Sequence, residues 1–192
     1  AAAAGADYIG FGPCFPTATK GYETGKTTEQ IEVAIEAAAK HALPLFGIGG
    51  ITADNLLPLR TLGVDRIDHG VRCEEDPALV RELAASRIPL TVCPLSNIRL
   101  RVFDDMLQHT LPRMLDAGLC VTLNSDDPAY FGGYLNDNYL QTFAALHLNA
   151  QQAYKLAANS IEASFVPEED KHRWMHELKQ CFQGFIIGGD LI

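Results

Sequence analysis

Three short polar clusters, each following an apolar run, contain residue types suited to metal and proton-transfer chemistry. His69 follows the first run, Ser96 and Asn97 the second, and Asp126 and Asp127 the third. Because successive residues point in different directions, one aspartate can bind a cation while the next holds a substrate, and a cation relieves the repulsion between them. The structural alternatives are a solvated Asp-Asp-Pro turn that caps the next helix and a hydrogen-bonded surface histidine.

Apolar runs alternate with amphipathic stretches, which predicts alternating strands and helices, right-handed crossovers and a parallel sheet. The expected strands are 8–12, 43–48, 64–67, 90–93 and 119–123. The expected helices are 28–41, 52–62, 77–86 (with Asp76 as N-cap), 103–117 (broken or bent near Pro112) and, with a break near 166–167, about 138–182. The sequence therefore predicts an α/β fold, specifically a partial or rearranged (β/α) barrel with about five strands and a helical C-terminal region.

This architecture would bring the three polar clusters together. In parallel α/β folds the reactive side chains lie at the carboxyl ends of the strands, in the loops that follow them. His69, Ser96 and Asp126 each occupy such a position after consecutive strands. We therefore expect the clusters to face one mouth of the sheet, and their joint occurrence favours a site over three unrelated surface positions.

Composition narrows the class of protein. The 192 residues are 47% hydrophobic and 20% charged, which is typical of a single globular domain spanning 1–192. A net charge of −9 argues against nucleic acid as a partner. The sequence has no apolar run of about 18 residues and no signal-peptide pattern, so we expect no membrane partner and a cytoplasmic location.

The cysteines add little to this picture at the level of sequence. The five are scattered, without a C-x-x-C pair, so neither a disulfide framework nor a thiolate zinc site is indicated. We expect reduced, buried thiols.

The three clusters and their surroundings resemble the adenine and adenosine deaminase family. The similar segments are Arg66-Ile67-Asp68-His69-Gly70, Cys93-Pro94-Leu95-Ser96-Asn97 and Leu123-Asn124-Ser125-Asp126-Asp127-Pro128. The continuation through Ala129-Tyr130-Phe131-Gly132-Gly133-Tyr134 and Asn136-Asp137-Asn138 resembles adenine deaminase in particular, and Ala157-Ala158-Asn159-Ser160 resembles the family's C-terminal helices. The resemblance covers about 62–182, within a deaminase-like part that we place at 62–192.

The resemblance implies a zinc cofactor, a purine base as ligand and a role for each of three residues. By position, His69 would orient and deprotonate the water bound to the metal. Asp126 would be the metal ligand, and Asp127 would contact the purine ring. Zinc lowers the pKa of a bound water to about 7, which makes hydrolysis possible at neutral pH.

The family's other zinc motifs are missing from this sequence. It contains neither the His-x-His motif nor the His-Ala-Gly-Glu motif, and the other histidines (His41, His109, His147, His172 and His176) fall on predicted helices or their ends. His172 and His176 are spaced i, i+4 and could grip a metal, although the charges around them favour a solvated face. Asp126 alone would not hold a catalytic zinc, which ordinarily takes three or more protein ligands.

The first part of the chain, 1–61, resembles thiamin-phosphate synthase, another (β/α)₈ barrel. The similar residues include Tyr8-Ile9-Gly10-Phe11-Gly12-Pro13, Phe15-Pro16-Thr17-Ala18-Thr19-Lys20 and Phe46-Gly47-Ile48-Gly49-Gly50. The resemblance implies a phosphate ligand held by Thr17, Thr19 and Lys20, with backbone N–H groups at Gly49 and Gly50. A plain surface loop is the alternative for 17–20.

Two unrelated partial motif sets suggest a recombined or engineered hybrid, joined near 59–64. Three functions stay open: a chimeric fragment without activity of its own, an adenine deaminase whose metal ligands another chain completes, and a residual phosphate binder. An open barrel fragment exposes sheet edges, so a homo-oligomer is also expected. The role of 183–192, including an apolar segment at 185–187 that suits either a strand or a docked tail, is left open.

Overall fold

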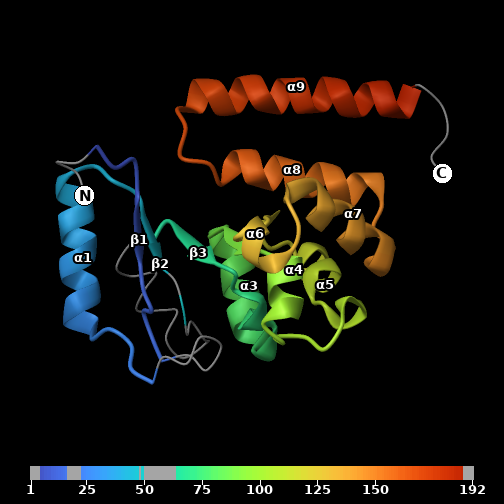
Figure 1. Ribbon diagram of the computed structural model, residues 1–192. Coiled ribbons are helices and arrows are strands. Elements are labelled where there is room, and N and C mark those ends of the chain that lie inside the picture. The colour runs from blue at the N-terminus through green and yellow to red at the C-terminus, as the bar shows by residue number, and fades with distance from the viewer. Residues whose placement is uncertain (1–4, 17–22, 48, 50–63, 188–192) are drawn as a thin grey trace.

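The computed structural model describes residues 5–16, 23–47, 49 and 64–187 (Figure 1). Within these residues the strands form one parallel sheet, whose spatial order β1-β2-β3-β4-β5 follows the chain. The strands are β1 (Ile9–Phe11), β2 (Leu45–Gly47), β3 (Arg66–Asp68), β4 (Leu90–Val92) and β5 (Val121–Leu123). Consecutive parallel strands lying side by side are the arrangement found along part of a (β/α) barrel, so the α/β prediction is confirmed.

The register of the sheet aligns the strand ends that carry the polar clusters. Ile67 pairs with Leu90, and Leu90 pairs in turn with Val121. Because these strands start level and run the same way, the residues after β3, β4 and β5 emerge at the same edge. The expected common mouth for the three clusters therefore exists.

The helices between the strands begin at local capping signals. α1 (Thr28–Lys40) has a capping box in which Thr27 and Gln30 each bond the other's backbone N–H. α3 (Pro77–Ser86) has Asp76 as N-cap, accepting from Ala78 and Leu79, and Pro77 at its first position, as predicted. A 3₁₀ helix, η3 (Val71–Glu75), joins β3 to α3.

Two local predictions between β4 and β5 are wrong. A loop was expected after Pro94, but the helix α4 (Pro94–Arg99) begins there. Proline suits the first turn of a helix, because its fixed φ is helical and because the N–H that it lacks would have no partner within the helix. The expected helix 103–117 is instead a short 3₁₀ helix, η4 (Met106–Gln108), and α5 (Leu111–Asp116). The break expected near Pro112 is present: Pro112 is the second residue of α5, because its ring excludes it from the interior of a longer helix.

The C-terminal region is helical, as expected, and consists of α6 (Pro128–Phe131), α7 (Leu135–Leu146), α8 (Ala150–Glu162) and α9 (Glu168–Ile187). α8 is tied to the sheet by Asn159, whose Nδ2 donates to the carbonyl of Val121 at 2.8 Å. α9 lies along α8 on the side away from the sheet (Figure 1), and the rings of Tyr154 and Phe182 are 4.8 Å apart. Residues 185–187 continue α9, so the terminal strand considered for them is wrong.

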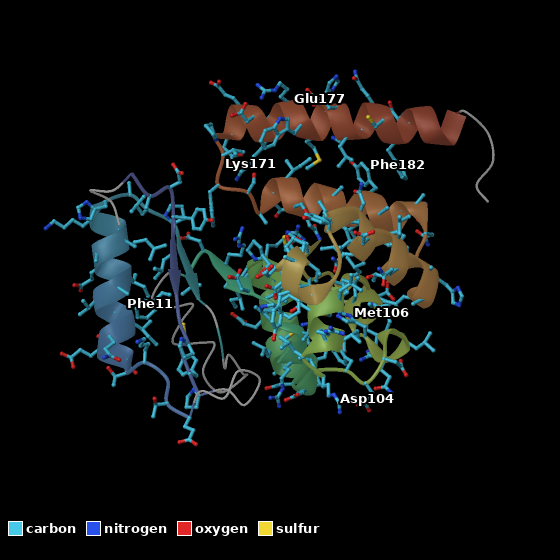
Figure 2. The ribbon with its side chains drawn as sticks, in the orientation of Figure 1. Phe11, Asp104, Met106, Lys171, Glu177 and Phe182 are labelled. Atoms are coloured by element: carbon cyan, nitrogen blue, oxygen red, sulfur yellow. The ribbon has the colours of Figure 1, made fainter. Side chains whose placement is uncertain are left out.

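The apolar core lies between the C-terminal strands of the sheet and the helices α5 and α8. Its most buried members are Val92, Met114, Leu119, Val121 and Leu156, each with none of its surface exposed. Figure 2 shows a dense crowd of side chains around this part of the chain, whereas side chains on the outer face of α9 extend into open space. No helix of the described residues is long and apolar enough to cross a membrane. The core includes Ile67, Val92 and Leu123, so it supports the strands β3, β4 and β5 that carry the polar clusters.

Candidate active site

His69 is held at the end of β3 by its own backbone. It has a left-handed φ of 63°, which is uncommon for a residue with a side chain. Its N–H donates to the carbonyl of Thr91 at 3.0 Å and reaches Thr91 Oγ1 at 3.3 Å. Gly70 follows, also with a positive φ, and η3 begins at Val71. Strained backbone that the neighbouring strand fixes in place is a frequent feature of functional sites.

Thr91, on β4, organises this end of the sheet. Its hydroxyl donates to Asp68 Oδ1 at 2.8 Å, and its carbonyl also accepts the Cys93 thiol at 3.4 Å. One residue of β4 thus positions Asp68 and His69 at the end of β3, and Cys93 at the start of α4.

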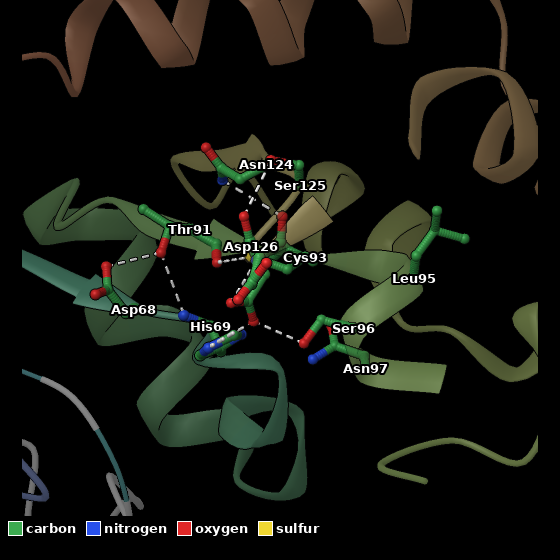
Figure 3. A network of polar contacts seen from close by, with 12 residues as sticks. Asp68, His69, Thr91, Cys93, Leu95, Ser96, Asn97, Asn124, Ser125 and Asp126 are labelled. Atoms are coloured by element: carbon green, nitrogen blue, oxygen red, sulfur yellow. Dashed lines mark hydrogen bonds and ion pairs between the residues drawn. The ribbon is translucent and has the colours of Figure 1, made fainter. Parts of the chain in front are cut away.

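Asp126 meets His69 across the mouth of the sheet, and the Asp126 carboxylate lies between His69 and Ser96 in Figure 3. The carboxylate oxygen Oδ2 lies 3.7 Å from His69 Nε2 and accepts a hydrogen bond from Ser96 Oγ at 2.7 Å. The other oxygen accepts from the backbone N–H of Asp127 at 2.9 Å. The side chains of His69 and Asp126 are 29% and 21% exposed, so both remain open to solvent.

Asp127 has a structural contact of its own. It is the N-cap of α6, and its Oδ1 accepts the N–H of Tyr130 at 3.2 Å. The helix-capping alternative for the Asp-Asp-Pro sequence is therefore present in the structure. The residue as a whole is exposed, and the structure shows no substrate contact that would test the purine role.

Asn97, unlike Ser96, is turned into the interior. Its Oδ1 lies 3.1 Å from His109 Nε2, and His109 Nδ1 accepts the N–H of Leu111. Burial, with a smaller effect from the charge of Arg113, lowers the pKa of His109 to about 4. His109 was expected on a helix, yet it lies buried at the end of η4 and supports α4 from beneath.

Cys93 is the member of the site that the sequence did not reveal. A group of three possible metal ligands consists of His69, Cys93 and Asp126. Each residue offers one donor atom, and the three atoms lie within 4.8 Å of one another. These residues form the metal-capable cluster of the described part of the chain. Nitrogen, sulfur and oxygen donors of these types are all zinc ligands, so the site fits a zinc ion. The search for C-x-x-C spacing identifies only cysteines that are neighbours in the sequence. Cys93 lies near His69 and Asp126, which follow other strands, so no sequence spacing indicated it.

The other cysteines largely follow the expectation of buried thiols. Cys14, Cys73 and Cys120 are buried, and Cys181 is exposed on α9. His172 and His176 are both exposed on α9, where His176 contacts Gln180, which agrees with the solvated face preferred for them.

The phosphate site drawn from the thiamin-phosphate synthase resemblance is mostly beyond the described residues. Thr17, Thr19, Lys20 and Gly50 lie outside them, as does the helix expected at 52–62. Gly49 is described: it has a φ of 86° after β2, and its carbonyl accepts the N–H of Phe15 at 3.1 Å. The positive φ suits glycine, and the phosphate role remains a prediction.

A cleft of about 650 Å³ lies over α4, the segment after it and α6. It is lined by Leu95, Ile98, Arg99, Arg101, Asp104 and Phe131. None of the candidate catalytic or metal-binding residues lines this cleft, so the cleft is separate from the candidate active site.

Comparison with known proteins places the chain in a family. The model of the adenosine deaminase family matches residues 31–181, and the chain belongs to that family. The match begins within 1–61, upstream of the expected junction, while the similarity of that segment to thiamin-phosphate synthase and the hybrid origin stay predictions.

Individual relatives are adenine deaminases. The adenine deaminase of Trichlorobacter lovleyi is 60% identical over 126 residues, which cover 65% of this chain and 36% of that protein. That of Ralstonia nicotianae is 61% identical over 118 residues, or 62% of this chain and 34% of that protein. The matched part therefore spans about a third of the length of these curated relatives.

Solved structures agree on the fold. The crystal structure of adenine deaminase from Arthrobacter aurescens superposes with a TM-score of 0.80 and 39% identity, over 92% of this chain and 53% of that one. An amidohydrolase from Burkholderia ambifaria, solved with bound zinc, has a TM-score of 0.70 and 23% identity, over 81% and 44% of the two chains. The sheet and helices thus correspond to part of an amidohydrolase barrel.

Proposed function

We propose that this chain carries the C-terminal portion of an adenine deaminase site and is not catalytically competent by itself. The observation that carries the proposal is the 3.7 Å approach of His69 Nε2 to Asp126 Oδ2, after the ends of β3 and β5. The high identity to adenine deaminases supports adenine as the substrate class.

The chain's own residues have defined tasks in the proposed hydrolysis. His69 would accept a proton from the attacking water, and Ser96 would hold the Asp126 carboxylate in place through its 2.7 Å hydrogen bond. Asp127, whose Oδ1 caps α6, would use its other oxygen toward the purine ring. A zinc ion bound by Asp126 would lower the pKa of water and so supply a nucleophile near neutral pH.

The proposed reaction balances as a hydrolysis. The water oxygen forms a bond to purine C6, and the bond from C6 to the exocyclic nitrogen breaks. One water proton leaves with that nitrogen as ammonia, and the other ends on the ring nitrogen of hypoxanthine. No oxidant or further reactant is required.

Turnover requires donors that these residues do not supply. In the proposed hydrolysis His69 acts as the base, so Asp126 is the one ligand of the family's zinc site that this chain supplies. A catalytic zinc typically takes three protein ligands, and the His-x-His and His-Ala-Gly-Glu motifs that the family uses are not in this sequence. The alternative, an active adenine deaminase completed by a second chain, differs only in where those donors come from.

Ammonia release from adenine tests this proposal. With added zinc, the purified chain is expected to release no more ammonia than Asp126→Ala, and turnover that disappears in Asp126→Ala would overturn the claim of incompetence. Co-expression with the part of the Trichlorobacter lovleyi enzyme that precedes the matched region should supply the missing donors. Ammonia release that requires His69 and Asp126 of this chain supports the proposal that the chain carries part of the deaminase site. Ammonia release that survives both His69→Ala and Asp126→Ala refutes it.

We further propose the hybrid origin suggested by the first 61 residues, with a residual phosphate site at Thr17, Thr19 and Lys20. Thermal stabilisation by phosphate that is lost in Lys20→Ala would support the phosphate site. No shift at millimolar phosphate would remove it, and a natural homologue collinear through 59–64 would rule out the splice.

A further inference from the structure

We infer that the chain binds a thiophilic divalent metal by itself, using the Cys93 thiolate together with His69 and Asp126. This goes beyond the proposed deaminase function, in which His69 is the base and the ligands come from Asp126 and from outside the chain. A His69 nitrogen bound to the metal cannot accept a proton, so the metal site inferred here belongs to the chain on its own and not to the completed deaminase site. The three donors come from the ends of three adjacent strands, and each is held by contacts that the fold provides.

The separation of the donor atoms is close to that of a metal site. All three atoms lie within 4.8 Å of one another, with His69 Nε2 and Asp126 Oδ2 at 3.7 Å. In a tetrahedral zinc site with bonds of 2.0–2.3 Å the donor atoms are about 3.3–3.8 Å apart. Closing the site therefore requires the donor atoms to move together by roughly 1 Å.

Contacts around each donor residue hold it in a position that favours metal binding. The Thr91 carbonyl accepts both the His69 N–H and the Cys93 thiol, which brings these two residues to the same edge of β4. Ser96 Oγ orients the Asp126 carboxylate from the second coordination layer. Cys93 is only 5% exposed, whereas His69 and Asp126 are open to solvent. A metal would thus enter past the histidine and the carboxylate and meet the thiolate from inside.

The donor set selects the class of metal. One thiolate, one imidazole and one carboxylate suit Zn²⁺, Co²⁺ and Cd²⁺, and they do not suit Mg²⁺ or Ca²⁺, which prefer oxygen ligands alone. Binding replaces the thiol proton of Cys93, which passes to the buffer, and one open position is left for water or another ligand.

Cobalt titration of the reduced chain tests the inference, because a thiolate bound to Co²⁺ gives a charge-transfer absorption in the near ultraviolet. We expect the wild-type chain to develop this band and excess Mg²⁺ not to compete. Cys93→Ser should abolish the band and weaken cobalt binding by at least about tenfold, since even second-layer changes cost that much. The matched controls are Cys73→Ser, another buried thiol, and Cys181→Ser, the exposed thiol on α9; both should keep the band.

Three results would overturn the inference: no band at roughly millimolar cobalt, a band that persists in Cys93→Ser, or a band that disappears in Cys181→Ser. Circular dichroism establishes whether Cys93→Ser is folded. If it is not, Asp126→Asn retains the thiol and is decisive: a tenfold weaker affinity supports the site, and an unchanged affinity refutes it. Absorbance without ammonia release separates this site from the deaminase proposal, because the two are read in different assays.

Discussion

Mild acid is expected to destabilise this protein through His109, a buried base that the fold keeps neutral. Its ring nitrogen Nδ1 accepts the N–H of Leu111 at 3.1 Å, which it can do only without a proton. Nε2 then carries the proton and donates to Asn97 Oδ1, also at 3.1 Å. His109 is 2% exposed, and burial is the main cause of its lowered pKa of about 4.

The size and sign of the effect follow from the two pKa values. In the unfolded chain the pKa of a histidine is about 6.5, so as pH falls the unfolded state takes up the proton first. The stability that the neutral ring contributes is fully present above pH 6.5 and is lost between about 6.5 and 4. The loss reaches roughly 3 kcal/mol at its limit and about 2 kcal/mol at pH 5.

Urea unfolding of the wild type and His109→Gln at pH 7.5 and pH 5 measures this effect. Glutamine can replace one of the two hydrogen bonds and does not titrate in this range, and all other titrating groups are common to both proteins. The wild type should therefore lose about 2 kcal/mol more than the variant between the two pH values. An equal loss in both proteins would refute the assignment of a buried, neutral His109.

Two further variants test the local structure around the site. Gly70→Ala should lower the free energy of unfolding by roughly 1–3 kcal/mol, because Gly70 has a φ of 73° and a Cβ there would lie 2.8 Å from Leu90 Cδ2; an unchanged urea midpoint would contradict the close packing of β3 on β4. Asp76→Ala should cost about 1 kcal/mol in the same measurement, since it removes the N-cap of α3, while Asp76→Asn should retain most of the stability. Equal losses for Ala and Asn would indicate that charge, and not the cap, is responsible.

Local sequence signals predicted several elements well. The Asp76-Pro77 pair acts within one turn of the chain, and α3 begins and ends where the sequence indicated. The helix expected at 28–41 is α1, which ends one residue earlier at Lys40. Capping and proline geometry depend on three or four neighbouring residues, so they can be inferred without knowledge of the fold.

Predictions that depended on where one element stops and the next begins were weaker. Pro94 suits the end of a strand followed by a loop, but it equally suits the first turn of a helix. In the structure it is the first residue of the helix α4. The apolar run at 185–187 suited a terminal strand by composition, but it continues α9. A short apolar segment does not distinguish these outcomes by itself.

For the candidate site, the sequence by itself determined which residue types stand at the strand ends, and through them the resemblance to a deaminase. Only the tertiary structure decided which of these residues meet. It brings His69 to Asp126, turns Asn97 toward His109 and places Cys93 beside the pair. The physical reason is that strand register and the left-handed turns at His69 and Asp126 aim these side chains, and both arise from contacts between residues far apart in the chain.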